Sequence, residues 1–334
     1  MTRELVPYRG TTVDVAQASD WERMDKGERR RRIITACEHP HDHATLLHLF
    51  ESWIVLHGKA GARVSPHTRS SYLYGARMLL EAFVQQNLRH PDDAAANGWI
   101  RSMEQDGLAP ATVRVRKAAA AAFYKALRWS GATDADPFAD VQPARDPVAP
   151  WDKRSPYEED EVERVLASIA ASEREHAHEA NYKEQLWVAL AVLLGAHVGL
   201  RCSEMCDLLW QDIRFAQRKL RVRHGKGGKA ATIDMSTRLV EALEAYRAAH
   251  PGTTSVLPYR ARSTVWVYLK RACVTAGVEF KGVHSLRHTA GTSIVASGLS
   301  LEDAAQQLRH STIETSRSYA KWSNTRLKEF MDKR

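Results

Sequence analysis

The sequence predicts a mainly α-helical protein with one small β-hairpin, an α+β fold arranged as two domains. Apolar residues recur at helical spacing over most of the chain after residue 44. Five prolines between residues 134 and 156 interrupt this pattern and predict a linker. One stretch, 219–235, instead alternates polar and apolar residues on either side of a glycine-rich turn, as paired strands do.

Residues 1–43 are expected to form an irregular N-terminal extension, because they are polar and lack regular apolar spacing. They include four consecutive arginines at 29–32. A run of like charge is usually solvated, so we interpret these arginines as an exposed face. Phosphate contact by the same arginines is the less favoured alternative.

The segment 44–133 is predicted to be a small all-helical domain. A first helix is expected to end at Gly58, and a second begins after Ser65, where a serine followed by proline is a frequent helix start. The last helix of the domain is expected from 110 to about 130. Its polar side is basic, and the basic side chains at its start are Arg114, Arg116 and Lys117.

After the linker at 134–156, residues 157–334 are predicted to form the second domain, again mostly helical. The expected elements are helices at 158–172 and 185–197, a helical turn after Gly199, the hairpin at 219–235, helices at 237–248 and 264–277, helical segments between 284 and 320, and a final amphipathic helix at 324–331.

Composition favours a protein that binds a polyanion. The formal net charge is +8 and the isoelectric point is near 9.3, and lysine and arginine bind nucleic acid by neutralising phosphates. The apolar run at 186–200 is shorter than the roughly 20 residues that a membrane span needs. The first ten residues do not resemble a signal peptide, so we expect a cytoplasmic protein.

The four cysteines are expected to be small buried hydrophobic residues, and they are Cys37, Cys202, Cys206 and Cys273. Cys202 and Cys206 lie one helical turn apart, but no further cysteine or histidine pair completes a zinc site at the usual spacing. We therefore expect these cysteines to bind no metal.

A short C-terminal segment carries His284, Arg287, His288, His310 and Tyr319. A tyrosine hydroxyl titrates near pH ~10, so it is a poor nucleophile unless cationic donors stabilise the charge that develops on a phosphate. The segment supplies such donors. Each side chain alone would more often be structural, but together they predict attack on a phosphodiester without a metal or a cofactor.

Five motifs follow one another in the second domain: Gly-Leu-Arg-Cys-Ser-Glu at 199–204, Gly-Lys-Gly-Gly-Lys at 225–229, His-Ser-Leu-Arg-His at 284–288, Leu-Arg-His at 308–310 and a tyrosine at 319. In order and spacing they resemble the signature of the tyrosine recombinases, the phage integrase family. The helical first domain looks like the core-binding domain of that family. The resemblance therefore implies an N-terminal helical DNA-binding domain followed by a tyrosine-recombinase catalytic domain.

The resemblance implies that Tyr319 attacks the scissile phosphate and forms a 3′-phosphotyrosyl bond. Arg201 and Arg287 would hold the non-bridging oxygens, for which planar guanidinium groups are well suited. Lys226, in the hairpin turn, would protonate the departing 5′ oxygen. Lys229 lies in the same turn and remains the alternative general acid.

The remaining roles are also implied by the resemblance. His284 and His310 would each add a hydrogen bond and assist proton transfer, while Glu204 and His288 would support the other groups. The chain departs from the family at Arg309, where a glycine is usual. That difference bears on the local backbone geometry.

A protein of this kind would be a site-specific recombinase that cleaves and rejoins DNA through a Holliday junction, in integration, resolution or transposition. The tail at 322–330 is similar to that of the Xer-type subgroup, which implies four subunits, identical or mixed with a related recombinase, on double-stranded DNA with a specific core site. A type IB topoisomerase-like enzyme and a catalytically silent DNA-binding protein of the same fold are the alternatives. The side chains expected to contact DNA outside the catalytic set are Arg114, Arg116, Lys117 and Lys229.

Overall fold

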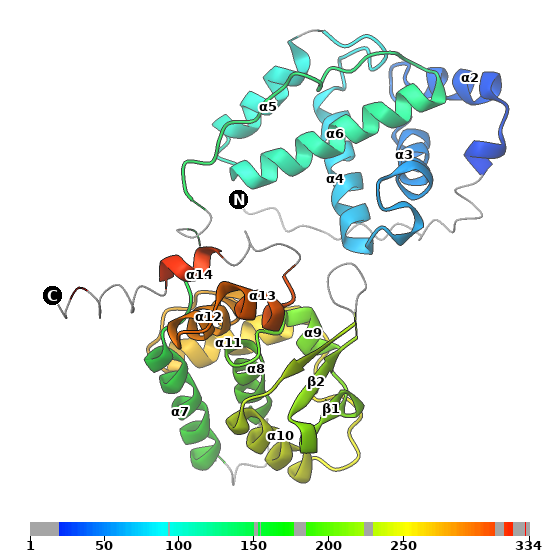
Figure 1. Cartoon of the computed structure of the whole chain (residues 1–334). Coiled ribbons are helices and arrows are strands. Elements are labelled where there is room, and N and C mark those ends of the chain that lie inside the picture. The colour runs from blue at the N-terminus through cyan, green and yellow to red at the C-terminus, as the bar shows by residue number, and fades with distance from the viewer. Residues whose placement is uncertain are drawn as a thin grey trace. The chain divides into compact units, whose positions relative to one another are not determined.

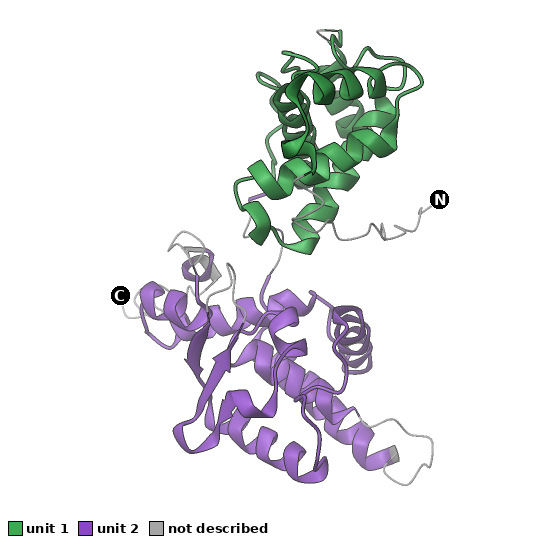
Figure 2. Cartoon of the chain, turned by 90° about the vertical axis from the view of Figure 1, so that its right-hand side faces the viewer, with its two compact units in different colours: residues 1–147 green, residues 148–334 purple. Residues whose placement is uncertain are grey.

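The computed structural model of the chain describes residues 20–92, 94–149, 153, 155–176, 185–223, 230–310, 317–322 and 331 (Figure 1). The chain divides into two compact units, unit 1 at residues 1–147 and unit 2 at residues 148–334 (Figure 2). The described part of unit 1 is helical, and unit 2 adds a three-stranded sheet to its helices. The predicted mainly α fold with a small sheet is confirmed.

Unit 1 is built from helices whose ends follow from local sequence. Asp25, Asp42 and Ser65 accept hydrogen bonds from first-turn amides of the helices that follow them. The last helix ends at Gly131, whose φ of 79° is in the left-handed region that glycine adopts readily. The elements are α2 (Lys26–Ala36), α3 (His43–His57), the short 3-10 helix η1 (Gly61–Arg63), α4 (Pro66–Ala82), α5 (Ala95–Gln105) and α6 (Pro110–Ser130).

The core of unit 1 surrounds the crossing of α4 with α6. Gly75 permits this close approach, because a Cβ atom there would lie 2.6 Å from the Cβ of Ala119. Phe50 of α3 meets Phe123 of α6 edge to face, with ring centroids 5.6 Å apart. Phe138 is buried in the same core although it follows α6 in the chain. The chain thus stays packed on unit 1 beyond residue 134, where we predicted the linker to begin.

The prediction of an irregular extension up to residue 43 is wrong for residues 20–43. Trp21 is buried, and α2 lies within this region. Arg29 is also buried: its guanidinium carbon lies 4.1 Å from the centroid of the Trp129 ring, and it donates a hydrogen bond of 2.8 Å to the Trp21 carbonyl. Arg30 donates to the carbonyl of Gly131 at 3.0 Å. Part of the arginine run therefore joins α2 to the end of α6 instead of forming a fully solvated face.

The most apolar helix of unit 2, Leu186–Ala196, lies at the centre of the core of that unit. Its elements are α7 (Glu159–His176), α8 (Leu186–Ala196), α9 (Cys202–Cys206), η2 (Trp210–Asp212), β1 (Ile213–Arg214), η3 (Phe215–Gln217), β2 (Lys219–Val222), β3 (Ala231–Asp234), α10 (Thr237–Ala249), α11 (Arg262–Thr275), α12 (Val283–Ala296), α13 (Leu301–Leu308) and α14 (Arg317–Trp322).

Helix α8 is apolar on all sides and contacts α7, α10, α11 and α12, as expected of a buried helix. Gly195 allows α12 to lie close, because a Cβ atom at this position would be 2.6 Å from the Cβ of Leu286. The interpretation of this segment as a core helix is confirmed. Among the described residues, no helix has the length and apolar character needed to cross a membrane.

The sheet is antiparallel in the order β1-β2-β3. Leu220 of β2 pairs with Ile213 on one side and with Ile233 on the other, so three buried apolar residues face the core together. The predicted hairpin is present as β2 and β3. Strand β1 was not predicted, because two residues are too few to show alternation.

The cysteines are free thiols, and Cys37, Cys206 and Cys273 are buried as expected. Cys202 is partly exposed. Burial raises the pKa of the Cys37 thiol to about 12, which makes it unreactive near neutral pH. In the part of the chain that the structure describes, no group of three or more His, Cys, Asp or Glu residues is arranged to hold a metal ion.

Candidate active site

Arg201 begins the site at a tight turn between α8 and α9. Gly199 precedes it with φ +69°, and a Cβ atom at Gly199 would lie 2.0 Å from the Cδ2 of Leu308. Arg201 then caps α9, and its backbone amide donates to Glu204 Oε2 at 2.8 Å. The Arg201 guanidinium donates from Nη1 to Glu204 Oε1 at 2.9 Å. The turn thus holds Arg201 at the surface of the core, with its side chain 26% exposed.

Arg287 lies on α12 and is almost completely buried, with 1% of its surface exposed. Its Nη1 donates to the carbonyl of Gly199, and its Nη2 donates to the carbonyl of Leu308. One guanidinium therefore joins the turn before α9 to the end of α13. Burial, followed by the neighbouring charges of Arg201 and Arg309, lowers the pKa of Arg287 to about 9.

His284 and His288 lie one turn apart on α12, so they share a face of that helix. Their ring centroids are 4.8 Å apart and the rings are nearly perpendicular. The ring of Tyr319, on α14, lies 6.0 Å from that of His288. The two histidines of the predicted motif and the predicted nucleophile are therefore brought together.

Tyr319 is buried against the face of α12, with 1% of its surface exposed. Gly291 makes room for it, because a Cβ atom there would lie 2.5 Å from Cε2 and Cζ of the Tyr319 ring. Burial raises the pKa of Tyr319 to about 12, although Arg287 and Arg201 act in the opposite direction. The phenol is consequently neutral near pH 7 and needs a base to become a nucleophile.

His310 stacks on Tyr319, with ring centroids 5.8 Å apart and an interplanar angle of 22°. Its pKa is lowered to about 4, first by burial and then by the positive charges of Arg287, Arg201 and Arg309. His310 is therefore a neutral imidazole near pH 7. A neutral imidazole can accept a proton, which is the function that a buried phenol beside it requires.

Arg309 is the site residue whose contacts the sequence did not predict. It ends α13 in the left-handed conformation, with φ 56° and ψ 45°. Its Nη2 lies 2.7 Å from Glu204 Oε2, and its side chain is 10% exposed. Glu204 itself is 3% exposed and is bonded to both Arg201 and Arg309. The sequence showed only that an arginine stands where the family usually has glycine.

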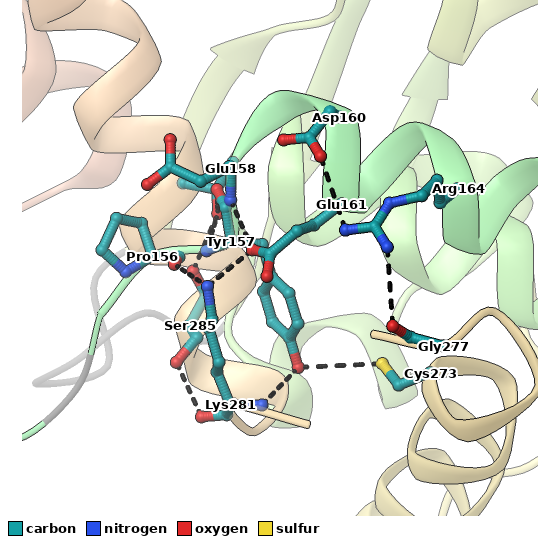
Figure 3. Close-up of polar contacts among 11 residues, drawn as sticks. Pro156, Tyr157, Glu158, Asp160, Glu161, Arg164, Cys273, Gly277, Lys281 and Ser285 are labelled. Carbon is teal, nitrogen blue, oxygen red and sulfur yellow. Dashed lines mark hydrogen bonds and ion pairs between the residues drawn. The ribbon is translucent and has the colours of Figure 1, made fainter. Parts of the chain in front are cut away.

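Residues 156–161, at and before the start of α7, are hydrogen-bonded to the segment that leads into α12 (Figure 3). Lys281 donates from Nζ to Glu161 at 2.5 Å and to the carbonyl of Pro156 at 3.1 Å, and its backbone amide donates to the Tyr157 hydroxyl at 2.9 Å. Thr289 of α12 accepts from the Tyr157 amide at 2.8 Å. These contacts anchor the helix that carries His284 and Arg287. Sequence reasoning missed them, because the partners lie more than a hundred residues apart.

Some predicted site residues cannot be placed relative to this cluster. Lys226 and Lys229 fall within 224–229, which lies outside the described residues. The predicted DNA-contacting side chains of α6 belong to unit 1. Arg114 is half exposed and lies 3.9 Å from Asp146, whereas Lys117 is partly buried. Arg116 is partly buried and lies beneath an exposed aromatic ring, its guanidinium carbon 5.7 Å from the ring centroid of Tyr74.

The site as a whole suits a phosphate group. Three guanidinium groups, two of them largely buried, lie close together, and the carboxylate of Glu204 is bonded to two of them. The pKa of His310 and that of Arg287 are both lowered, first by burial and then by the neighbouring positive charges. An anion placed among them would restore the balance of charge. A phenol and a neutral imidazole stand beside this cationic cluster, so the arrangement can support nucleophilic attack on phosphorus.

Comparison with known proteins gives matches over most of the chain. Residues 158–326 match the model of the phage integrase family. The tyrosine recombinase XerA of Thermococcus kodakarensis is 26% identical over 293 residues, covering 85% of this chain and 93% of that protein. The tyrosine recombinase XerC of Pelobacter propionicus is 28% identical over 295 residues, covering 83% and 92%. A lambda integrase tetramer bound to a Holliday junction has a similar fold, with a TM-score of 0.65 and 17% identity, over 83% of this chain and 76% of that one.

Proposed function

Since the chain belongs to the phage integrase family, we propose that it is a site-specific DNA recombinase that cleaves and rejoins DNA through a phosphotyrosyl bond at Tyr319. The main support is the packing of Tyr319 against His310 and α12, beside the cationic cluster of Arg201 and Arg287. The nucleophile and the groups that would stabilise its transition state come from separate motifs that fold to one place.

In the cleavage step, the Tyr319 oxygen forms a bond to phosphorus as the bond to the 5′ oxygen breaks. The phenolic proton goes to the neutral imidazole of His310, which stacks on the ring. The departing 5′ oxygen takes a proton from Lys226, a role that the family resemblance assigns, with Lys229 as the alternative. His284 and His288 support the proton transfers from α12.

The two arginines bind the non-bridging oxygens. A guanidinium has five N–H groups, and Arg287 uses two of its nitrogens on the Gly199 and Leu308 carbonyls, so other N–H groups remain for the phosphate. Arg201 gives one nitrogen to Glu204 and is partly exposed. Charge stabilisation of this kind requires no metal, and the phosphotyrosyl bond conserves the energy for rejoining to a 5′ hydroxyl.

Recombination joins two DNA sites, so we propose that four copies of the chain assemble on double-stranded DNA, alone or with a related recombinase. The lambda integrase tetramer on a Holliday junction supports this assembly by its similar fold. Arg114, Arg116 and Lys117 of α6 contact the duplex from unit 1 in this proposal. We also propose that the DNA carries a specific core site and that the protein acts in the cytoplasm.

The proposal is tested by trapping the covalent intermediate. Nicked duplexes made from the DNA that flanks the gene would be incubated with the protein, so that loss of the short fragment beside the nick prevents rejoining. We expect a protein–DNA adduct with the wild type and none with Tyr319→Phe, which removes only the nucleophilic oxygen. DNA binding without an adduct would favour a silent binding protein. Relaxation of supercoiled DNA without recombinant products would favour a topoisomerase.

A further inference from the structure

Arg309 occupies a backbone position that is unfavourable for arginine. It has φ 56° at the end of α13, where a side chain with a Cβ atom is strained and glycine is not. The side chain turns inward and is 10% exposed. A buried cation at a strained position indicates an interaction that glycine could not provide.

That interaction is with Glu204, which is buried and shared. Arg309 Nη2 lies 2.7 Å from Glu204 Oε2, and the Arg201 amide donates to the same oxygen at 2.8 Å. The other oxygen, Oε1, accepts from Arg201 Nη1 at 2.9 Å. One carboxylate therefore lies between two guanidinium groups, and the three side chains together carry one net positive charge.

The sharing changes what Arg201 can offer to a ligand. A carboxylate with a single arginine partner tends to bind two of its nitrogens and balances its charge completely. Here Glu204 Oε2 accepts a hydrogen bond from Arg309, so the Arg201 guanidinium is bonded to the carboxylate through Nη1 alone. The positive charge of that guanidinium is therefore not fully compensated. Arg201 is also the most exposed of the three side chains, at 26% against 10% for Arg309 and 3% for Glu204.

We infer that Arg309 is a positioning residue for DNA cleavage, which shares Glu204 with Arg201 and so keeps the Arg201 guanidinium oriented toward the scissile phosphate with its positive charge only partly compensated. The inference rests on the proposed function. Arg309 need not touch the phosphate, because it acts through the carboxylate. Its contribution should therefore depend on the negative charge of the phosphate and on the presence of Glu204.

The test compares Arg309→Gly with the wild type in single-turnover formation of the covalent adduct. Removal of one charge-assisted interaction is expected to slow cleavage by about tenfold or more. The same rates are measured on a duplex with a methylphosphonate at the scissile position, which carries no negative charge. On that substrate the ratio of the wild-type cleavage rate to the variant cleavage rate should be smaller. A purely structural defect would instead reduce the cleavage rate of both substrates by the same factor.

Two further comparisons keep the inference falsifiable if Arg309→Gly does not fold. Arg309→Lys and Arg309→Met are similar in length but differ in charge, so the lysine variant should cleave faster, and equal rates would overturn the inference. In a Glu204→Gln background, replacing Arg309 should add little further loss. A wild-type protein that forms no adduct on either substrate would overturn the proposed function together with this inference. Normal cleavage by the wild type and by Arg309→Gly would overturn the inference alone.

Discussion

Replacement of Gly199 by alanine should disrupt the site through two separable effects. The first is backbone strain at φ +69°, which costs an L residue about 1–2 kcal/mol. The second is a collision, because the new Cβ would lie 2.0 Å from Leu308 Cδ2, whereas carbon atoms prefer about 3.5–4.0 Å. Leu308 is fully buried, so relief of the collision requires movement of the end of α13 or of the Gly199 turn.

Gly277 provides a matched control for the first effect alone. It has φ +63°, and no atom lies within 4 Å of the Cβ that alanine would add. Gly277→Ala should therefore lose only about 1–2 kcal/mol of unfolding free energy. Gly199→Ala should lose about 1–3 kcal/mol more, which is typical of overpacking a core. In a unit of this size, each kcal/mol lowers the melting temperature by about 2–4 °C.

The collision should also reduce cleavage, because Arg287 donates to the carbonyls of both Gly199 and Leu308. A displacement of about 1 Å in a catalytic group can reduce a rate about 100-fold. Thermal unfolding and single-turnover adduct formation would be measured for both variants. If Gly199→Ala matched Gly277→Ala in melting temperature and in cleavage rate, the reasoning from the Leu308 contact would be refuted.

Three further predictions concern charge. The pKa of His310 is lowered from 6.5 to about 4 in the folded protein, so as the pH drops the imidazole takes up its proton in the unfolded chain before it does so in the folded one. The unfolding free energy should therefore fall between about pH 6.5 and about pH 4. Unfolding titrations of a His310→Gln variant should show a weaker dependence on pH. Lys281→Met leaves the Glu161 carboxylate, which is only 15% exposed, without its cation and should lower the unfolding free energy by about 1–3 kcal/mol. Arg164→Met is the control: it breaks the exposed pair with Asp160 and should change the unfolding free energy by less than about 0.5 kcal/mol. Arg29→Ala should lower the melting temperature through loss of about 2 kcal/mol of stacking and hydrogen bonding, and Arg31→Ala, at an exposed position, should leave it unchanged.

Much of the fold was predictable because local sequence determines it. The start of α4 after Ser65, the end of α6 at Gly131 and the pairing of β2 with β3 each follow from a cap, a turn or an alternation within a few residues. The order of the site motifs was also visible in the sequence. Helix α2 was missed, because its apolar content is low and its stability comes from contacts such as that of Arg29 with Trp129.

The contacts that assemble the site were not predictable, because they use groups that every sequence contains. Arg287 donates to the backbone carbonyls of Gly199 and Leu308, which lie 88 and 21 residues away. Every residue has a backbone carbonyl, so the sequence does not indicate which carbonyls Arg287 will bind. Likewise, Gly291 could be identified as space for the Tyr319 ring only after α14 was placed against α12. Sequence reasoning identified the chemical groups, and the structure supplied their arrangement.

The arrangement links folding to chemistry through one buried cation. Since both hydrogen bonds of Arg287 reach carbonyls that neighbour other site residues, unit 2 cannot fold around Arg287 without bringing Arg201 and His310 close to it. Burial, and after it the repulsion between the gathered positive charges, lowers the pKa of Arg287 and that of His310, and both effects are unfavourable for the folded protein alone. A phosphodiester bound there would remove this repulsion. Under the proposed function, part of the stability lost in gathering the cations would be recovered when DNA binds, at the position where negative charge would increase during attack by Tyr319.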